Sequence, residues 1–177
     1  SLRHTGMGTF KMNDTCIKCP RGFSQTLQNQ EHCDICLAGK FTHKSGESSC
    51  FDCVPGSYQQ RQQSTECKSC AQHTYSDASM TNKTECVVCP AGFLTKSHGS
   101  TSCMKCEVGK YGISTNIGDK EERSDADPKE AYVRCITCPI GWKRADNDTD
   151  PTFCIQCAVG QMTDGEGATS CLGCDFG

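Results

Sequence analysis

The chain is 177 residues long, contains 18 cysteines and carries a net charge of only -3. Leu, Ile, Val and Phe together make up about 14% of the residues, which is too little for an ordinary apolar core in a chain of this length. The small net charge argues against a disordered tail, and the low apolar content argues against a globular enzyme. Composition therefore predicts a small disulfide-rich fold in which cross-links replace the missing core.

All the cysteines fall into nine Cys-x-x-Cys pairs, so the chain is an internal repeat. A glycine stands three residues after the second cysteine of every pair except the fourth, where His73 replaces it, and an aromatic or long apolar side chain follows. The spacing between pairs is 17 residues in most steps, 19 in two and 32 in one. The pairs begin at Cys16, Cys33, Cys50, Cys67, Cys86, Cys103, Cys135, Cys154 and Cys171.

The first two segments of the chain are a degenerate repeat and a regular array. Residues 1–15 predict a degenerate N-terminal repeat, because Gly8-Thr9-Phe10 repeats the glycine-x-aromatic element with Thr5 where a cysteine would be expected. Residues 16–112 predict regular cysteine-rich repeats without a linker between them. Turn glycines four residues before a pair predict short loops between two small strands in each repeat. These glycines are Gly46, Gly99 and Gly167.

The last two segments are an insertion and a second array. Residues 113–134 predict a charged insertion loop, read first as a solvated surface excursion. Its alternatives are a partner contact or a calcium loop, for which Asp125, Asp127 and Glu130 would supply oxygen ligands, although the spacing is not that of an EF-hand. The acidic cluster at residues 146–150 has the same interpretations: a solvated surface segment first, and a partner contact or a calcium loop as alternatives. Residues 135–177 predict cysteine-rich repeats that end in mid-repeat.

Metal and redox chemistry fit the cysteine pairs poorly. Two Cys-x-x-Cys pairs can hold zinc, but eighteen sulfurs do not divide into sets of four and the repeats do not alternate. A thioredoxin-like centre needs one pair at a helix N-terminus, whereas nine loop pairs indicate structural disulfides. We therefore expect no metal and no cofactor.

The compartment follows from the disulfides and from three N-glycosylation sequons. So many paired thiols oxidise in a secretory pathway, which predicts an extracellular protein, secreted or at the cell surface. The sequons begin at Asn13, Asn82 and Asn147, and the last two lie in the 19-residue intervals, where a longer exposed loop has room for a glycan. No apolar run reaches the roughly 20 residues of a membrane helix, and we expect a mature portion of a longer protein.

No other constellation predicts chemistry. The five histidines share no position in the repeat, no serine lies in a nucleophile-elbow context, and no glycine-rich phosphate loop is present. The slightly acidic balance disfavours nucleic acid. We expect a protein that is not an enzyme.

Two units carry a resemblance to a known family. Cys53-Val54-Pro55-Gly56-Ser57-Tyr58 and Cys89-Pro90-Ala91-Gly92-Phe93, each followed by a Ser/Thr-rich approach to the next pair, resemble the ephrin-receptor-like cysteine-rich repeat, which is akin to the modules of tumour-necrosis-factor receptors. Such repeats occur in animal receptors, secreted adhesion proteins and the surface or flagellar-hair proteins of protists. The resemblance covers nearly the whole chain and departs from the pattern at His73 and in the insertion.

The resemblance implies that the second cysteine of one pair bonds the first cysteine of the next. In the alternative connectivity, the first cysteines of two neighbouring pairs bond to each other, and so do their second cysteines. This connectivity needs an even number of pairs and leaves one of the nine pairs without a partner pair. The implied ladder leaves Cys16 and Cys174 for bonds outside it, to a further repeat or between chains. Its bonds are Cys19–Cys33, Cys36–Cys50, Cys53–Cys67, Cys70–Cys86, Cys89–Cys103, Cys106–Cys135, Cys138–Cys154 and Cys157–Cys171.

These features favour an elongated rod of tandem two-stranded repeats, each touching only its neighbours. The function we expect is that of a structural extracellular glycoprotein, which acts as a filament or flagellar-hair protomer or an adhesive stalk, with head-to-tail self-association or another extracellular protein as partner. The alternative is a receptor ectodomain that binds a protein ligand through loops around residues 112–134.

Overall fold

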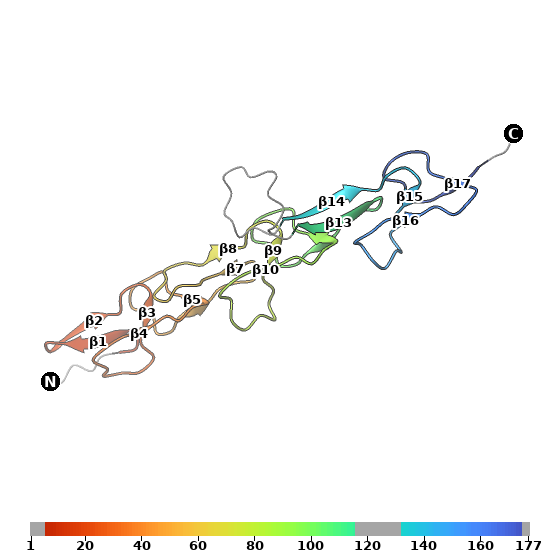
Figure 1. The fold of residues 1–177 in the computed structure, drawn as a ribbon. Helices are drawn as coiled ribbons and strands as arrows, with labels where there is room; N and C mark the ends of the chain where they lie inside the picture. The colour runs from red at the N-terminus through yellow and green to blue at the C-terminus, as the bar shows by residue number, and fades with distance from the viewer. Residues whose placement is uncertain (1–5, 116–131, 175–177) are drawn as a thin grey trace, which may run out of the picture. The chain divides into compact units, whose positions relative to one another are not determined.

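The computed structural model describes residues 6–115 and 132–174, and these residues form short strands and turns without a helix (Figure 1). The strands are β1 Thr9–Met12, β2 Thr15–Lys18, β3 Phe23–Ser24, β4 Asp34–Ile35, β5 Lys40–Phe41, β6 Phe51–Asp52, β7 Ser57–Tyr58, β8 Lys68–Ser69, β9 Thr74–Tyr75, β10 Val87–Val88, β11 Phe93–Leu94, β12 Met104–Lys105, β13 Lys110–Thr115, β14 Tyr132–Thr137, β15 Trp142–Lys143, β16 Ile155–Gln156, β17 Gln161–Met162 and β18 Leu172–Gly173.

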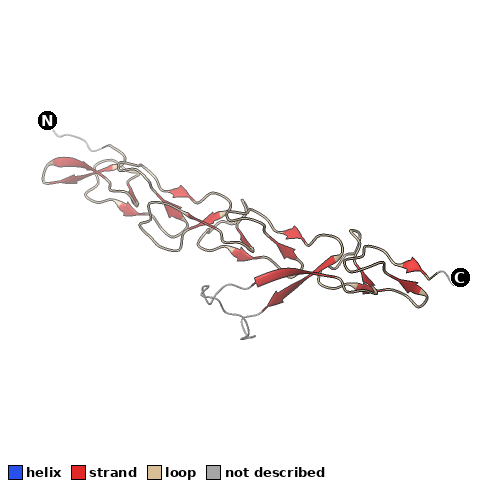
Figure 2. Ribbon diagram, turned by 90° about the horizontal axis from the view of Figure 1, so that it is seen from above, coloured by secondary structure: helices blue, strands red, loops and turns tan. Residues whose placement is uncertain are grey.

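Within the described ranges, each odd-numbered strand pairs with the strand that follows it, which gives nine separate two-stranded sheets (Figure 2). The first strand of a repeat comes directly after the repeat glycine, and the second consists of the residues between the two cysteines of the next pair. The predicted fold class, a small disulfide-rich chain of tandem two-stranded repeats, is confirmed.

We number the repeats 1 to 8 by the second cysteine of each of the first eight pairs, which starts the repeat. One hydrogen bond closes every hairpin: the amide of the second cysteine of the next pair donates to the carbonyl of the repeat glycine, as Cys36 does to Gly22 at 2.9 Å. His73 accepts the same bond from Cys89 in repeat 4. The starting cysteines are Cys19, Cys36, Cys53, Cys70, Cys89, Cys106, Cys138 and Cys157.

The residues before Cys19 form a shortened copy of this hairpin, the N-terminal repeat. Strands β1 and β2 pair from Thr9↔Lys18 to Met12↔Thr15, and the Cys19 amide donates to the Gly8 carbonyl at 2.9 Å. Asn13 and Asp14 make the turn, both with positive φ, and neither Asn nor Asp is strained there as a larger residue would be. Residues Thr9–Lys18 therefore form the same kind of hairpin as the later repeats.

The predicted insertion begins and ends as an antiparallel ribbon. Strands β13 and β14 are six residues each and pair from Lys110↔Thr137 to Thr115↔Tyr132, so both extend into residues 113–134. Residues 116–131 lie outside the described part of the chain, and with them the calcium candidates Asp125, Asp127 and Glu130.

The chain divides into two compact units. The first contains residues 1–71, 75–87 and 97–101, and the second contains residues 72–74, 88–96 and 102–177. The division runs through repeats 4 and 5, which each contribute residues to both units.

The interior of the repeats is built from sulfur and polar groups, with little aliphatic carbon. The cysteines that start repeats 1 to 7 are buried, and Val133 and Ala168 are the buried aliphatic residues among those described. The aromatic that follows the repeat glycine is only half-buried in repeats 1 to 6, and its counterparts Trp142 and Met162 are exposed. The remaining buried side chains are polar: Ser24, Gln25, Thr42, Ser57, Gln59, Ser76, Thr95, Arg144 and Thr163.

Candidate functional site

The disulfide ladder is the principal site of this chain. Within the described residues eight disulfides form, each from the second cysteine of one pair to the first cysteine of the next, which is the connectivity that the resemblance implies. Their Cα–Cα distances are 5.6–5.8 Å, within the usual range for a disulfide. The bonds are Cys19–Cys33, Cys36–Cys50, Cys53–Cys67, Cys70–Cys86, Cys89–Cys103, Cys106–Cys135, Cys138–Cys154 and Cys157–Cys171.

A buried position, polar in all but one repeat, connects a repeat to the one before it. This position is the third residue after the repeat-glycine position. In repeats 1 to 5, 7 and 8 its carbonyl or side-chain oxygen accepts the amide of the preceding repeat-glycine position. Gly22 donates to the Thr42 hydroxyl at 2.7 Å and Gly56 donates to the Ser76 carbonyl at 2.7 Å. The residues at this position are Gln25, Thr42, Gln59, Ser76, Thr95, Gly112, Arg144 and Thr163, and all are buried.

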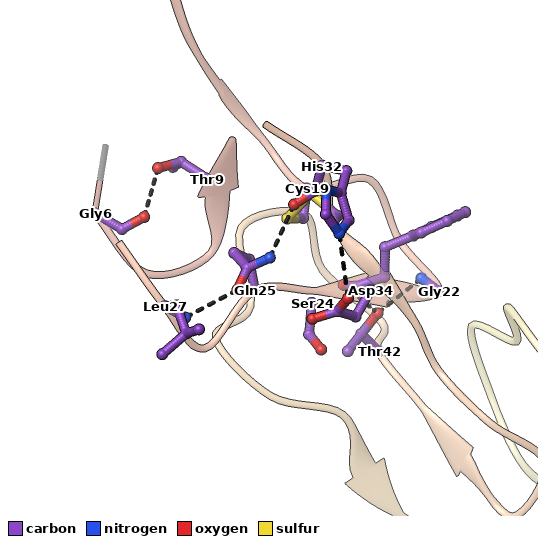
Figure 3. The surroundings of a disulfide bond; sticks show 12 residues. Gly6, Thr9, Cys19, Gly22, Ser24, Gln25, Leu27, His32, Asp34 and Thr42 are labelled. Atoms are coloured by element: carbon purple, nitrogen blue, oxygen red, sulfur yellow. Dashed lines mark hydrogen bonds and ion pairs between the residues drawn. A yellow bond between two sulfur atoms is a disulfide. The ribbon is translucent and has the colours of Figure 1, made fainter. Parts of the chain in front are cut away.

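The side chain at the buried polar position determines how the connection is made. Thr42 Oγ1 accepts from the Gly22 amide and donates to the Phe23 carbonyl, so one hydroxyl joins two backbone groups of repeat 1. Gln25 instead holds its own loop, since its Nε2 donates to the His32 carbonyl at 2.8 Å and its Oε1 accepts from the Leu27 amide at 2.9 Å (Figure 3). These polar side chains satisfy backbone groups that would otherwise be buried without partners.

A second connection reaches past the neighbouring repeat. In repeats 2, 3, 5 and 8, the turn residue four positions before a cysteine pair packs on the repeat glycine two repeats earlier, so closely that a Cβ on Gly56 would overlap the Gly99 carbonyl oxygen. A Cβ on Gly8 would overlap Gly46, and one on Gly109 would overlap Gly167. The same turn residue donates its amide to the cysteine that starts the preceding repeat, as Gly99 does to Cys70 at 2.8 Å.

The expectation that each repeat touches only its neighbours is therefore wrong. The loops between the two strands are long enough to fold back along the chain, and the glycines leave room for backbone to meet backbone. Each repeat is held by the next one and by the one after that within the compact units that contain these contacts. The turn glycines were predicted to form local loops only, and the polar residue after the first strand of each repeat was not singled out in the sequence.

His73 replaces the repeat glycine in repeat 4. Its φ is 65°, so a side chain is accommodated in the left-handed conformation at the repeat-glycine position. Two repeats later stands repeat 6, whose strands pair as far as Thr115↔Tyr132 and do not turn back at the usual position. In repeats 1, 2, 3, 5 and 6 a side chain at the repeat-glycine position would crowd a later repeat.

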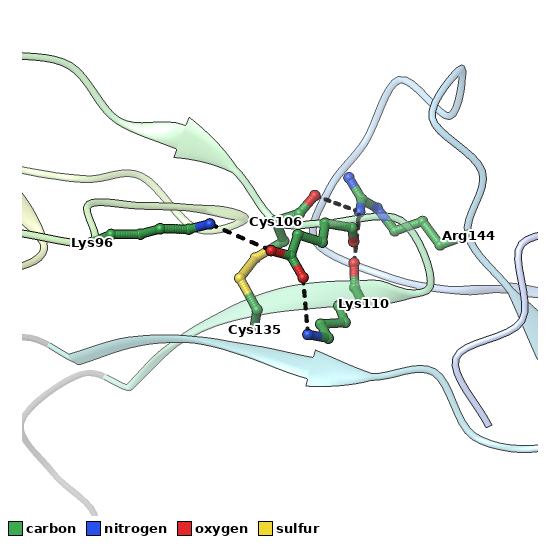
Figure 4. A network of polar contacts seen from close by, with 6 residues as sticks. Lys96, Cys106, Lys110, Cys135 and Arg144 are labelled. Atoms are coloured by element: carbon green, nitrogen blue, oxygen red, sulfur yellow. Dashed lines mark hydrogen bonds and ion pairs between the residues drawn. A yellow bond between two sulfur atoms is a disulfide. The ribbon is translucent and has the colours of Figure 1, made fainter.

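Arg144 occupies the buried polar position of repeat 7 and contacts repeat 6. It is 1% exposed, and its Nη1 donates to the carbonyls of Cys106, Glu107 and Lys110 at 2.6–3.0 Å (Figure 4). Its Nε and Nη2 are buried without a protein partner among the described residues. Because Lys110 is the first residue of β13, Arg144 fixes the base of the β13–β14 ribbon.

An exposed ion network lies beside this arginine. The Glu107 carboxylate accepts from Lys110 Nζ at 3.1 Å and from Lys96 Nζ at 3.4 Å (Figure 4). The hydrogen bond from Lys110, and then its charge and that of Lys96, lower the pKa of Glu107 below its ordinary value. A depressed pKa stabilises the fold above the ordinary carboxyl pKa, and the stabilisation is lost as the pH falls through the folded-state pKa. For exposed groups the effect is small.

In the acidic cluster at residues 146–150, the carboxylates of Asp148 and Asp150 accept hydrogen bonds from their own loop. The Asp148 carboxylate accepts from the Ala145 amide at 2.6 Å, and Asp150 accepts from the amide of Thr152 at 2.8 Å. The hydrogen bond from the Thr152 hydroxyl is the largest cause of the lowered pKa of Asp150. Lys105 donates to the backbone carbonyls of Asp146 and Asp148. The described residues contain no group of three or more His, Cys, Asp or Glu placed to hold a metal ion.

The sequons and the two remaining cysteines lie on the surface. Asn13, Asn82 and Asn147 are all exposed. In the described part of the chain, the cysteines outside disulfides are Cys16, which is exposed, and Cys174, which is half-buried. Thr5 occupies the sequence position that would supply the ladder partner of Cys16.

The fold and the ladder define a class of protein: tandem disulfide-bonded two-stranded repeats, which fit an extracellular structural or binding segment. No helix among the described residues is long and apolar enough to span a membrane. A scan against protein-family models found no match. A search of curated proteins found no similar sequence either.

Proposed function

We propose that this chain is a load-bearing structural segment of an extracellular glycoprotein, which serves as a stalk, an adhesive surface or a filament protomer of the flagellar-hair kind. It would not be an enzyme, and its partners would be further copies of itself or another extracellular protein. The observation that carries the proposal is the covalent path through the ladder. A pull on the two ends passes from Cys36 across the disulfide to Cys50, and then through only two residues to Cys53.

The path has a definite length in each redox state. An oxidised repeat contributes 5.6 Å across the disulfide and about 10 Å along three residue steps, or about 16 Å when fully extended. The same repeat after reduction contributes 17 residue steps, about 58 Å. The ladder thus limits the fully extended length of one repeat to roughly a third of the length that the same repeat reaches after reduction.

Single-molecule force spectroscopy tests this role. The oxidised chain should stop extending at the length set by the ladder, and the same molecule with reductant should extend about threefold further. Equal extension in both states would refute the load-bearing role.

The glycoprotein part of the proposal rests on the exposure of Asn82 and Asn147 in the lengthened loops of repeats 4 and 7. Material from a eukaryotic secretory pathway should lose mass at both sites after glycosidase treatment. Unmodified asparagine at both sites would contradict it. The receptor alternative depends on the insertion, and its residues 116–131 lie outside the described chain, so no observation favours it over the structural role.

A further inference from the structure

Three aromatic rings meet on the surface of repeat 2. Phe41 on β5 lies opposite Phe51 on β6, and His43 follows Phe41 by two residues, so the three side chains share one face of the hairpin. Their ring centroids are 6.0–6.1 Å apart in each pair. Phe51 is 42% exposed, His43 is exposed and Phe41 is half-buried. We call these three residues the aromatic cluster.

The hairpin itself does not require three rings. A cross-strand pair stabilises a small sheet, but repeat 3 makes that pair from Tyr58 and Lys68. The aromatic cluster therefore exposes apolar ring surface beyond the need of its own repeat, which favours a ligand with an apolar face. The position of His43, the fourth residue after the repeat glycine, has no ring in the other repeats, where it is Thr26, Gln60, Asp77, Lys96, Ile113, Ala145 or Asp164.

The loop that carries the Asn82 sequon packs on the same hairpin. Gly39 is the repeat glycine of repeat 2, two residues before Phe41, and a Cβ on it would stand 3.3 Å from the backbone nitrogen of Lys83. The Lys83 carbonyl also accepts the Gln59 amide at 2.9 Å, and the Gln59 carbonyl accepts the Gly39 amide at 2.7 Å. These contacts place the Asn82 Cα within roughly 17 Å of the Phe41 Cα.

The sequon of the other lengthened loop is placed in the same way. In repeat 7, Pro151 packs on Gly92, the repeat glycine of repeat 5, where a Cβ would overlap the proline ring. Lys105 lies on β12 of repeat 5, and its ammonium donates to the carbonyls of the residues directly before and after Asn147, at 3.3 and 2.7 Å. Each of these contacts lies within one compact unit. Both 19-residue repeats thus hold a sequon beside the hairpin two repeats earlier.

An N-glycan has the chemistry that suits the aromatic cluster. The C–H face of a pyranose ring is apolar and packs on aromatic rings, while the hydroxyl groups remain in water. An asparagine side chain with the first two N-acetylglucosamine rings attached spans a distance comparable with that between Asn82 and the cluster. Because the sugar is tethered to the same chain, it avoids the entropic cost of association that a free sugar would have.

We infer that the N-glycan on Asn82 packs on the aromatic cluster of repeat 2 and holds repeat 4 against it. The inference rests on the glycoprotein part of the proposed function and assigns that glycan a binding site on its own chain. The sugar covers Phe51 and His43 and adds a contact between two repeats that are two places apart. Loss of the glycan exposes the rings again and loosens the contact at Gly39.

NMR of the isotope-labelled full chain, secreted by a eukaryotic host that attaches short oligomannose glycans, tests the inference. Nuclear Overhauser contacts should join protons of the first two sugar rings to ring protons of the aromatic cluster, and ring currents should shift these sugar protons upfield. Sugar protons with the shifts of a free glycan and without such contacts would overturn the inference.

Substitutions of the rings show whether the contacts come from the cluster. Phe51→Ala should abolish the Overhauser contacts. His43→Ala should weaken them, and it protects the test against a Phe51 variant that fails to fold, because His43 is exposed and lies outside the strands. Val87→Ala is the matched control, since Val87 has the strand position of Phe51 in repeat 4 and is 44% exposed, and it should leave the contacts unchanged. Contacts that survive both ring substitutions would overturn the inference.

The energetic effect is measured by hydrogen exchange at the Gly39 amide, which bonds to Gln59. The glycosylated chain should exchange this amide at least about threefold more slowly than Asn82→Gln, because the sugar opposes local opening. Phe51→Ala should cancel the difference. Asn13→Gln removes a different sequon and should leave the Gly39 exchange rate unchanged. Equal rates with and without the Asn82 glycan would contradict the clamping of repeat 4 on repeat 2.

Failure of this inference differs from failure of the proposed function. Mass measurement first establishes whether Asn82 is modified. An unmodified Asn82 contradicts the glycoprotein part of the proposed function, and the inference fails with it. A modified Asn82 whose sugar makes no contact with the aromatic cluster leaves the proposed function intact and overturns the inference alone.

Discussion

At the scale of single residues, the glycines of this chain have two distinct roles. Positive φ favours glycine at every repeat position, but the packing of a later turn requires it at only some of them. Gly56 and Gly160 have nearly the same φ, 81° and 80°, and differ in whether a turn covers them. This pair allows conformational strain and crowding to be measured separately.

Alanine at Gly56 should be far more destabilising than alanine at Gly160. Both variants place a Cβ in the left-handed region, at about 1–2 kcal/mol. Gly56→Ala must also displace the Gly99 carbonyl and weaken the neighbouring hydrogen bonds, at about 1 kcal/mol each. Denaturant titration of the monomeric, oxidised protein measures the difference in unfolding free energy. Equal losses for the two variants would contradict the packing of turn on glycine.

The Thr42 hydroxyl, at 2.7 Å, is the nearer of two acceptors for the Gly22 amide, and the other is the Thr42 carbonyl at 3.2 Å. Thr42→Val keeps the shape of the side chain and removes the oxygen that accepts from Gly22, so we expect a loss of about 1–2 kcal/mol and faster exchange of the Gly22 amide. Thr42→Ser keeps the oxygen and should behave nearly as the native protein. The measurement is amide exchange by NMR, and a valine variant with native protection at Gly22 would show that the hydroxyl is dispensable.

At the scale of elements, a repeat is a hairpin whose stability comes from other repeats. Two strands of two residues cannot form a stable sheet alone. The hairpin is closed by its disulfide, by the bond from the next second cysteine to the repeat glycine, and by turns of later repeats. Loss of one hairpin should therefore destabilise the repeats before it and the repeats after it.

Removal of the Cys53–Cys67 disulfide by serine substitution of both residues should unfold more than repeat 3. A loop of this size contributes about 3 kcal/mol in the chain-entropy model. We expect faster hydrogen exchange at the Gly39 amide, which bonds to repeat 3, and also at the Gly99 amide, whose residue packs on Gly56 two repeats away. The equivalent change at Cys157 and Cys171 is the control and should leave Gly99 protected. If hydrogen exchange becomes faster only in repeats 2 to 4, each repeat is stabilised by its immediate neighbours alone, and the contacts two repeats away do not contribute.

At the scale of the whole molecule, the periodicity of cysteine, glycine and aromatic residues was sufficient to predict the fold class. The turn glycines predicted two small strands in each repeat, but the positions of those strands, after the repeat glycine and between the two cysteines of a pair, come from the structure. The long ribbon β13–β14 was not predicted, since residues 113–115 and 132–134 read as the ends of a charged loop. Pairing between residues so far apart in the sequence leaves little local signal.

The buried polar position was also missed, for a physical reason. Burial is normally inferred from apolar side chains, and this interior is made of polar ones that bond to backbone. Arg144 is the extreme case, a fully charged side chain that sequence alone places on the surface. Its burial depends on three carbonyls brought together by the start of β13, which no local pattern reveals.

The connectivity of the ladder determines the covalent path through the repeats, the closure of each hairpin and the position of Cys174 outside the disulfides. Digestion of the alkylated, unreduced protein followed by mass spectrometry tests it most directly. We predict peptides that join Cys53 to Cys67 and Cys89 to Cys103. Peptides that join Cys50 to Cys67, the first-to-first pairing, would contradict this connectivity and the load-bearing path that depends on it.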